Sequence, residues 1–218
     1  VGSISSANGA ELPDGTTDAQ AYAVALGADG LPRWRERLAD YFAHVTPLGL
    51  VEDRFGEPTV LVWTSTDYVH HLANGDPETG SVVLLSRQGR VERRYDVGMR
   101  LTGVLLTDLE GDGHRDVLAA DRTGRLHVLD ETLTLKRRLE ITTNTLNSVN
   151  LVPAVALSRS GASGQRWVAL TSSRMEDRTA PWPGSTRESI PVILQHDNEV
   201  VVLDSHLRQV TRHRVAEV

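Results

Sequence analysis

Four acidic residues are spaced through one short stretch of the chain so that their side chains could surround a cation. The stretch reads Asp-Leu-Glu-Gly-Asp-Gly-His-Arg-Asp, with its acids at Asp108, Glu110, Asp112 and Asp116. Carboxylates that lie close together repel one another unless a cation separates them, and hard oxygen ligands suit Ca²⁺. Glycines at positions 111 and 113 allow the backbone angles of a tight loop. These residues therefore predict a calcium loop.

Two other structures would also accommodate these residues. One is a solvated acidic turn between two strands. The other is an EF-hand, because Gly113 falls at the sixth loop position, but Ala119 stands at the twelfth, where that loop needs a bidentate Glu. The flanking segments 102–107 and 116–120 are rich in apolar residues and predict strands rather than helices. The flanks therefore also argue against an EF-hand.

With the apolar run Val117-Leu118 that follows it, the acidic stretch resembles the calcium loop of FG-GAP/VCBS-type β-propeller repeats. Such repeats are found in the heads of integrin α-subunits and in many bacterial surface proteins. The resemblance implies side-chain ligands at Asp108, Glu110, Asp112 and Asp116, and a further ligand at the backbone carbonyl of His114. The family more often has Asp or Asn where this chain has Glu110.

Composition narrows the class of protein. The 218 residues are 39% hydrophobic and 24% charged, as in an ordinary globular protein. The net charge of −6, without any basic block, argues against a nucleic-acid partner. No stretch approaches the roughly 18 apolar residues that span a membrane, so membrane insertion is not expected. The chain contains no cysteine, which excludes disulfides and fits an extracellular, periplasmic or cell-surface location.

One hairpin pattern, an apolar strand, a polar turn and an Arg-rich strand, occurs four times. The first strands end in leucine, at Leu26, Leu85, Leu129 and Leu203. The recurring apolar residues are predicted to form the core, namely Val24, Leu26, Val60, Val62, Val83, Leu85, Val117, Leu118, Leu126, Val128, Val168, Leu170, Val200 and Val202. A second unit of strand, polar loop and strand precedes the last three hairpins. Four antiparallel strands in each repeat are typical of a β-propeller blade.

We therefore predict an all-β, propeller-like fold with four-stranded antiparallel blades. Residues 1–20 are expected to form a polar linker or arm, and residues 21–218 the propeller domain. The domain is expected to comprise a half-blade at 21–41 and blades at about 47–98, 101–142 and 150–217. About four blades either close as a compact ring or form part of a larger propeller with blades from a longer chain. An open arc would expose sheet edges and favour self-association.

Two long inserts, 65–80 and 171–197, are predicted to be loops that share one end of the molecule, opposite the acidic loop. Loops on a rigid scaffold commonly form binding surfaces. The predicted ligand-binding residues are Tyr68, His70 and His71 in the first insert and Trp182 in the second. In the alternative interpretation, the histidines are merely solvated and Trp182 packs beneath its own loop.

The sequence contains no pattern typical of catalysis. It lacks a Gly-x-Ser-x-Gly elbow, a phosphate loop and a His-Glu-x-x-His pair. The predicted function is a non-catalytic, calcium-stabilised propeller module that presents a loop face to a protein or a carbohydrate. The alternative is the propeller scaffold of a carbohydrate-active enzyme, such as a polysaccharide lyase. Glu, Lys or His side chains from two or more blades that converge within hydrogen-bond reach in a pocket would indicate the enzyme.

Overall fold

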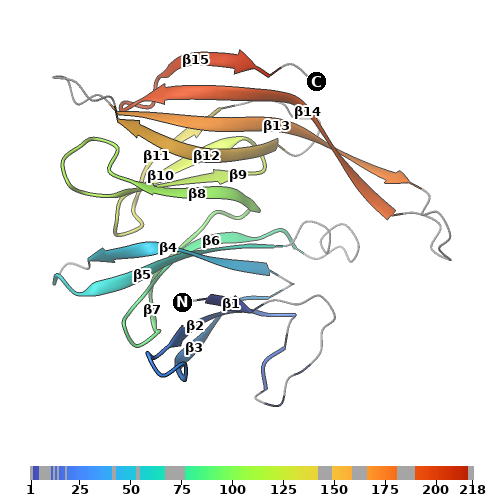
Figure 1. The fold of residues 1–218 in the computed structure, drawn as a ribbon. Coiled ribbons are helices and arrows are strands. Elements are labelled where there is room, and N and C mark those ends of the chain that lie inside the picture. The colour runs from blue at the N-terminus through green and yellow to red at the C-terminus, as the bar shows by residue number, and fades with distance from the viewer. Residues whose placement is uncertain are drawn as a thin grey trace.

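The computed structural model is all-β, and its strands form four antiparallel sheets (Figure 1). The structure describes residues 2–4, 11, 13, 15–17, 19–40, 43–52, 55–66, 77–141, 149–158, 166–180 and 190–215. Only the backbone is described for 2–4, 149–158, 166, 173–180 and 190–197. None of these ranges contains a helix that could span a membrane.

The first sheet has three strands in the order β1 (Gly2–Ile4), β2 (Ala21–Leu26) and β3 (Pro32–Ala39). The predicted hairpin of β2 and β3 is present. Strand β1 belongs to the segment 1–20, for which the sequence predicts a linker or arm, and it pairs with β2 through Ser3↔Ala23. A free edge of β2 would leave backbone N–H and C=O groups unpaired, and β1 satisfies some of them.

The other three sheets each contain four strands that follow one another in chain order, as predicted. The second sheet comprises β4 (Ala43–Glu52), β5 (Pro58–Thr66), β6 (Gly80–Leu85) and β7 (Val91–Asp96). The third comprises β8 (Leu101–Thr107), β9 (Asp116–Asp121), β10 (Arg125–Leu129) and β11 (Leu135–Glu140). The fourth comprises β12 (Val149–Ser158), β13 (Arg166–Ala180), β14 (Ile190–Asp204) and β15 (Gln209–Arg214). These blade-like sheets stack in chain order (Figure 1).

The insert 171–197 is a β-ribbon over most of its length, so the prediction of a loop there is wrong. Strands β13 and β14 pair as far as Ala180↔Ile190, whereas the pairing of β12 with β13 reaches only Arg174. The ribbon therefore extends beyond its neighbours in the sheet (Figure 1). Its two arms run antiparallel, which satisfies the backbone groups that a loop would leave to water.

The turn between the last two strands has the same backbone geometry in all four sheets. The residue after the recurring leucine donates its N–H to the carbonyl four residues later, in the pairs Gly27–Leu31, Ser86–Arg90, Asp130–Thr134 and Asp204–Arg208. Each turn also has one residue with φ between 62° and 82°, namely Gly30, Gly89, Leu133 and Leu207. This shared geometry indicates that the sheets are copies of one unit.

Leu133 and Leu207 adopt this left-handed backbone because their side chains fill the space between successive sheets. Each is 7% exposed, and each belongs to the apolar cluster that its sheet shares with the preceding one. In the second sheet the position is Gly89, and a Cβ there would lie 2.4 Å from the Trp34 ring of the first sheet. The space beside this turn is thus filled either by a leucine of the later sheet, as at Leu133 and Leu207, or by a side chain of the earlier sheet, as by Trp34.

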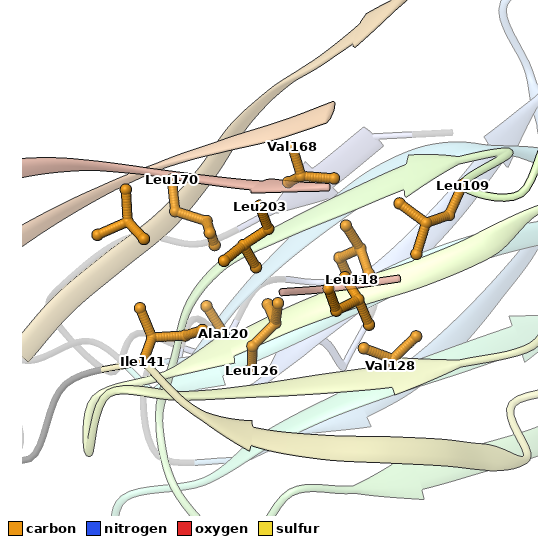
Figure 2. Packing of buried hydrophobic residues seen from close by; sticks show 11 residues of the cluster. Leu109, Leu118, Ala120, Leu126, Val128, Ile141, Val168, Leu170 and Leu203 are labelled. Atoms are coloured by element: carbon orange, nitrogen blue, oxygen red, sulfur yellow. The ribbon is translucent and has the colours of Figure 1, made fainter. Parts of the chain in front are cut away.

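The hydrophobic core lies between the sheets. Figure 2 shows the layer in which Leu118 and Leu126 of the third sheet pack with Leu170 and Leu203 of the fourth. Both faces of the middle sheets are covered, so every residue of β6 and β9 is buried. Burial on both faces explains why these strands are continuous apolar runs instead of alternating patterns.

A buried polar network joins the second and third sheets. The His127 ring, 2% exposed, lies between the Tyr95 hydroxyl and the Asp121 carboxylate, with both contacts at 3.0 Å. Burial raises the pKa of Asp121, but hydrogen bonds from His127, Thr123 and the Arg125 backbone outweigh it and lower that pKa overall. The anion is therefore the stable form of Asp121 within the core.

The predicted core includes Leu26, Val60, Val200 and Val202, but the structure shows that Leu26 is exposed and that the three valines are only partly buried. Leu26 is 60% exposed, whereas Leu85 and Leu129 are 0% and Leu203 is 2% exposed. Each of the buried leucines belongs to a cluster shared with the preceding sheet. Tyr22 and Val24, on the same face of β2, are buried, so the exposure is confined to the end of the strand that enters the turn.

The left-handed turn of the third sheet makes a prediction about stability. Leu133→Ala and Leu133→Gly both remove the buried side chain, but Gly also relieves the backbone strain. We expect the Gly variant to be more stable than the Ala variant by roughly 0.5–1 kcal/mol. At Leu118, in extended β9, we expect the opposite order. Urea unfolding of the four variants measures both differences, and the same order at both positions would contradict this account.

Candidate metal loop and adjoining groove

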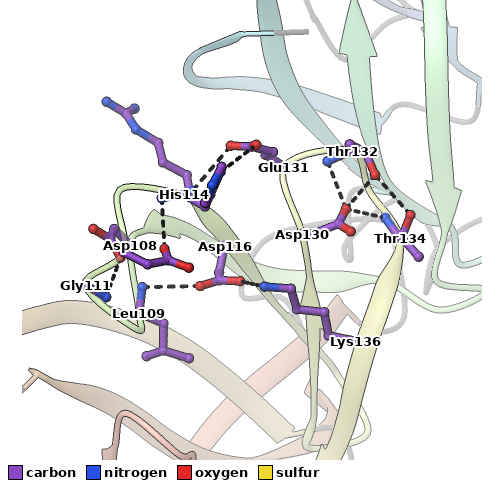
Figure 3. Close-up of polar contacts among 12 residues, drawn as sticks. Asp108, Leu109, Gly111, His114, Asp116, Asp130, Glu131, Thr132, Thr134 and Lys136 are labelled. Atoms are coloured by element: carbon purple, nitrogen blue, oxygen red, sulfur yellow. Dashed lines mark hydrogen bonds and ion pairs between the residues drawn. The ribbon is translucent and has the colours of Figure 1, made fainter. Parts of the chain in front are cut away.

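The acidic loop connects β8 to β9 at one end of the third sheet (Figure 3). Gly111 has φ of 81° and Gly113 has φ of 93°, a region that glycine enters at little cost. Both glycine N–H groups donate to Asp108, at 2.6 Å and 3.1 Å. The Asp108 carboxylate therefore holds the loop in its turn.

Asp116, at the start of β9, anchors the other side of the loop. Its carboxylate is buried, with the residue 3% exposed, and one oxygen accepts the Leu109 N–H at 3.2 Å. Its other oxygen lies 2.8 Å from the ammonium of Lys136 on β11, as Figure 3 shows. The hydrogen bond to Asp116 raises the pKa of Lys136 against the opposing effect of burial. The loop thus has a cation of its own chain at its base.

His114 and Arg115 connect the loop to neighbouring segments. The His114 ring lies 3.1 Å from the Glu131 carboxylate, and the hydrogen bond to Glu131 raises the pKa of His114. The Arg115 guanidinium donates to the Leu50 carbonyl of the second sheet at 3.4 Å. The loop therefore contacts both the β10–β11 turn and the adjacent sheet.

The predicted ligand residues lie on one loop, but their carboxylates do not converge on one point. They are Asp108, Glu110, Asp112, His114 and Asp116. Among the described residues, no three His, Asp or Glu side chains form a group that could hold a metal ion. Asp108 and Asp112 accept hydrogen bonds from the loop's own backbone, and Asp116 binds Lys136. The donors are hard oxygens of the kind that Ca²⁺ binds, so the chemistry fits although side chains must rotate.

A groove adjoins the loop, between the second and third sheets. Its volume is about 670 Å³, and Leu50, Glu52, His114 and Glu131 are among the residues that line it. A cavity of about 310 Å³ shares Glu52 and Glu131 with it and adds Phe55, Glu92 and Arg93. The two hollows therefore adjoin each other at Glu52 and Glu131, and together they are called the recess; side chains from two sheets line it.

The recess combines apolar and acidic surfaces. Phe55 is 74% and Leu50 is 60% exposed. Glu52, Glu92 and Glu131 supply carboxylates that can accept hydrogen bonds from a ligand. Titratable groups of two sheets line the recess, but the hydrogen-bonded pair His114–Glu131 belongs to the third sheet alone.

The sequence did not predict this recess, because ligand binding was assigned to the two longest inserts, 65–80 and 171–197. An available signal was Phe55, one of 2 phenylalanines in the chain, which stands in the polar segment Asp-Arg-Phe-Gly-Glu. The predicted ligand-binding residues Tyr68, His70, His71 and Trp182 all lie outside the described residues.

The Lys136–Asp116 pair makes a prediction about stability. Lys136→Met removes the ammonium from a buried carboxylate, which keeps only the Leu109 N–H among these contacts. Because Lys136 itself is partly exposed, we expect a loss of about 1–2 kcal/mol in unfolding free energy. In an Asp116→Asn background the same substitution should cost almost nothing. Equal losses in both backgrounds, measured by urea unfolding, would show that the pair does not stabilise the loop.

No model of a known protein family matches this chain, and no curated protein has a similar sequence.

Proposed function

We propose that this chain is a non-catalytic binding module, built from propeller-type blades and braced by Ca²⁺ at the Asp108–Asp116 loop, that binds a protein or carbohydrate ligand. Three features support the proposal: the stacked four-stranded sheets, the resemblance of the loop to FG-GAP/VCBS repeats, and the adjoining recess. The observation that carries it is the gathering of acidic residues on one tight turn, where buried Asp116 already pairs with a positive charge, the Lys136 ammonium, at 2.8 Å.

The argument for Ca²⁺ is electrostatic. Asp108, Glu110, Asp112 and Asp116 bring four carboxylates to one short loop. Lys136 supplies a single positive charge, and it reaches only Asp116 in the structure. A divalent ion can meet several carboxylates at once and relieve their mutual repulsion, which one ammonium does only in part. Calcium therefore displaces Lys136 from Asp116 or shares that carboxylate with it.

The cellular location that we propose follows from the calcium affinity that we expect of the loop. Calcium loops of extracellular modules bind at about 10⁻⁴–10⁻³ M. A loop that must first release backbone hydrogen bonds and an ammonium is suited to that range, because those losses reduce the affinity. We place the module outside the cell, in the periplasm or on the cell surface.

Calcium is expected to raise the melting temperature. At one hundred times its dissociation constant, a ligand that binds only the folded state adds about 2.7 kcal/mol, or ~5–10 °C for a domain of this size. Asp112→Ala should abolish the rise. Asp29→Ala removes an acid from an exposed turn on another sheet and should leave the rise intact. Thermal melts in calcium and in chelator test this, and identical wild-type curves would refute the calcium brace.

The recess is the proposed ligand surface at the same end of the third sheet. An exposed aromatic ring can pack on the apolar face of a sugar or on a peptide side chain, and nearby carboxylates can accept hydroxyl or amide hydrogens. Phe55 and the acids Glu52 and Glu131 supply these groups here. The recess is therefore suited to a ligand with both apolar and hydrogen-donating surfaces.

Phe55→Ala is expected to abolish ligand capture without changing the fold, since Phe55 is 74% exposed. Glycan arrays and pull-downs with the wild-type chain identify the ligand, and the variant is then compared at equal concentration. Trp182→Ala tests the ligand-binding residue that the sequence predicts in the second insert. Loss of capture in Trp182→Ala alone would move the binding surface to the inserts 65–80 and 171–197.

The enzyme alternative has one observation in its favour. Glu52, Glu92 and Arg93 of the second sheet line the same recess as Glu131 of the third. Acidic and basic groups around a bound sugar are what polysaccharide cleavage requires. Release of unsaturated sugars from acidic polysaccharides, and its loss in Glu131→Gln, would favour the enzyme over the binding module.

A further inference from the structure

Positive charge gathers on the last strand of each sheet. These outermost strands, β3, β7, β11 and β15, contain ten of the chain's 23 Lys and Arg residues but only four of its 29 Asp and Glu residues. All ten basic residues are exposed. With His neutral, the outermost strands therefore carry a net charge of +6 on a chain whose net charge is −6. A protein that is acidic as a whole thus presents a basic surface.

The protection of sheet edges does not account for this excess of one charge. Charged side chains keep an edge strand from pairing with another molecule, but charges of either sign serve that purpose. Like charges that lie close together also repel one another, so a surface with ten cations and four anions gains stability from a bound anion. The excess of arginine therefore indicates a partner of negative charge.

Arginine side chains connect the outermost strands of neighbouring sheets. The ninth residue after each recurring leucine is an arginine, namely Arg35, Arg94, Arg138 and Arg212. Arg94 donates to the Leu38 carbonyl of β3, and Arg212 donates to the Ile141 carbonyl, which follows β11. Arg93 of β7 lines the same cavity as Thr132, in the turn before β11. The basic surface therefore continues from each sheet to the next.

A hollow of about 330 Å³ lies in this surface, between β3 and β7. Arg37 and Asp40 line it from β3 and the residue after that strand, and Arg94 and Asp96 line it from β7. The Ser81 hydroxyl donates to Asp96 at 2.7 Å, and the Arg37 guanidinium lies 3.8 Å from Asp40. Each wall thus has a guanidinium and a carboxylate, so the hollow can take both an anion and a hydrogen-bond donor.

The hollow is open because the second sheet has small side chains at this place. Thr64 and Ser81, which are 2% and 5% exposed, also line it. Counted along the paired strands, the equivalent residues of the third sheet are the larger Asp121 and Arg125. There Asp121 binds His127 in the buried network that joins the second and third sheets. The space that this network fills between those sheets is thus left free between the first and second sheets.

The mixture of charges on this surface distinguishes one kind of polyanion from another. Duplex DNA has a phosphate charge roughly every 1.7 Å along its axis, and its backbone offers hydrogen-bond acceptors. The carboxylates among the arginines, such as Glu92, Asp96 and Glu140, would repel such a backbone. An acidic polysaccharide has more widely spaced carboxylates, which match the arginine fork, and hydroxyl groups that can donate to Asp and Glu. The surface therefore suits the polysaccharide better.

We propose that the outermost strands form a binding surface for a carboxylated polysaccharide, with one acidic sugar ring in the hollow between β3 and β7. The carboxylate of that ring accepts hydrogen bonds from Arg37 and Arg94, and its hydroxyl groups bind Thr64 and Asp96. The arginines of the other outermost strands attract the rest of the polysaccharide. This surface goes beyond the function proposed above, because it requires neither calcium nor Phe55.

Isothermal titration calorimetry of the intact chain, in chelator, tests the class of partner. The probes are three carboxylated polysaccharides, polygalacturonate, alginate and hyaluronan, together with neutral dextran and a DNA duplex. At least one carboxylated polysaccharide should bind, with an affinity that falls as salt is added, and dextran should not bind. At equal charge concentration the duplex should bind more weakly than that polysaccharide. No binding of any of the three, or tighter binding of the duplex, would overturn the proposal.

Two single substitutions test the hollow with the polysaccharide that binds. Arg37→Gln removes a charged hydrogen bond to the sugar ring and should weaken binding by about tenfold or more. Arg208→Gln is the matched control, because it removes one positive charge from an exposed arginine in the turn before β15 and should change the affinity little. Circular dichroism establishes that both variants are folded. Equal losses of affinity in the two variants would show that the ring does not bind in the hollow.

Phe55→Ala separates this surface from the recess. The variant should bind the polysaccharide as the wild type does, even where it no longer captures a ligand through the recess. Loss of polysaccharide binding in Phe55→Ala would place the polysaccharide in the recess and overturn the role of the outermost strands. Because the titrations are made in chelator, their outcome is independent of the calcium brace.

Discussion

The packing of apolar sheet faces on one another is the interaction on which the rest of this structure depends. Strands β6 and β9 are buried along their whole length, so each middle sheet is apolar on both faces. Such a sheet is unstable alone in water and must be covered on both sides. Stacking is therefore a requirement of the sequence, and every other feature is arranged around it.

Polar contacts fix the spacing of the stack. The outermost strands are rich in arginine, and several of these side chains donate to backbone carbonyls of the neighbouring sheet. Arg137 reaches the His206 carbonyl at 2.8 Å, and Arg212 reaches the Ile141 carbonyl at 2.6 Å. Together with the His127 network, these bonds satisfy groups at the margins of the apolar layers. The recurring arginines therefore have a structural role between the sheets.

The acidic loop and the recess are products of the same stacking. Leu109 is a loop residue whose side chain packs in the core between the third and fourth sheets, which anchors the loop to that core. Arg115 contacts Leu50 across the boundary with the second sheet. Lys136 comes from the far edge of its own sheet to meet Asp116. The side chains of the loop are thus held in place by strands and turns that the packing of the sheets brings together.

The sequence alone determined the local features, because those depend on neighbouring residues. The four hairpins, the strands flanking the acidic loop and the role of Gly111 and Gly113 were predicted correctly from strand patterns and turn chemistry. Strand pairing within each sheet follows from the same information, since consecutive antiparallel strands need only short connections.

Only the tertiary structure decided which surfaces are covered and which side chains meet. Leu26 has the same local sequence pattern as Leu85, yet Leu26 is exposed, whereas Leu85 is buried because it packs on Ala21 and Ala23 of the first sheet. Asp116 was predicted as a metal ligand, and its lysine partner lies 20 residues away along the chain. Packing and ion pairs between distant segments depend on how the sheets stack, so local sequence patterns do not predict them.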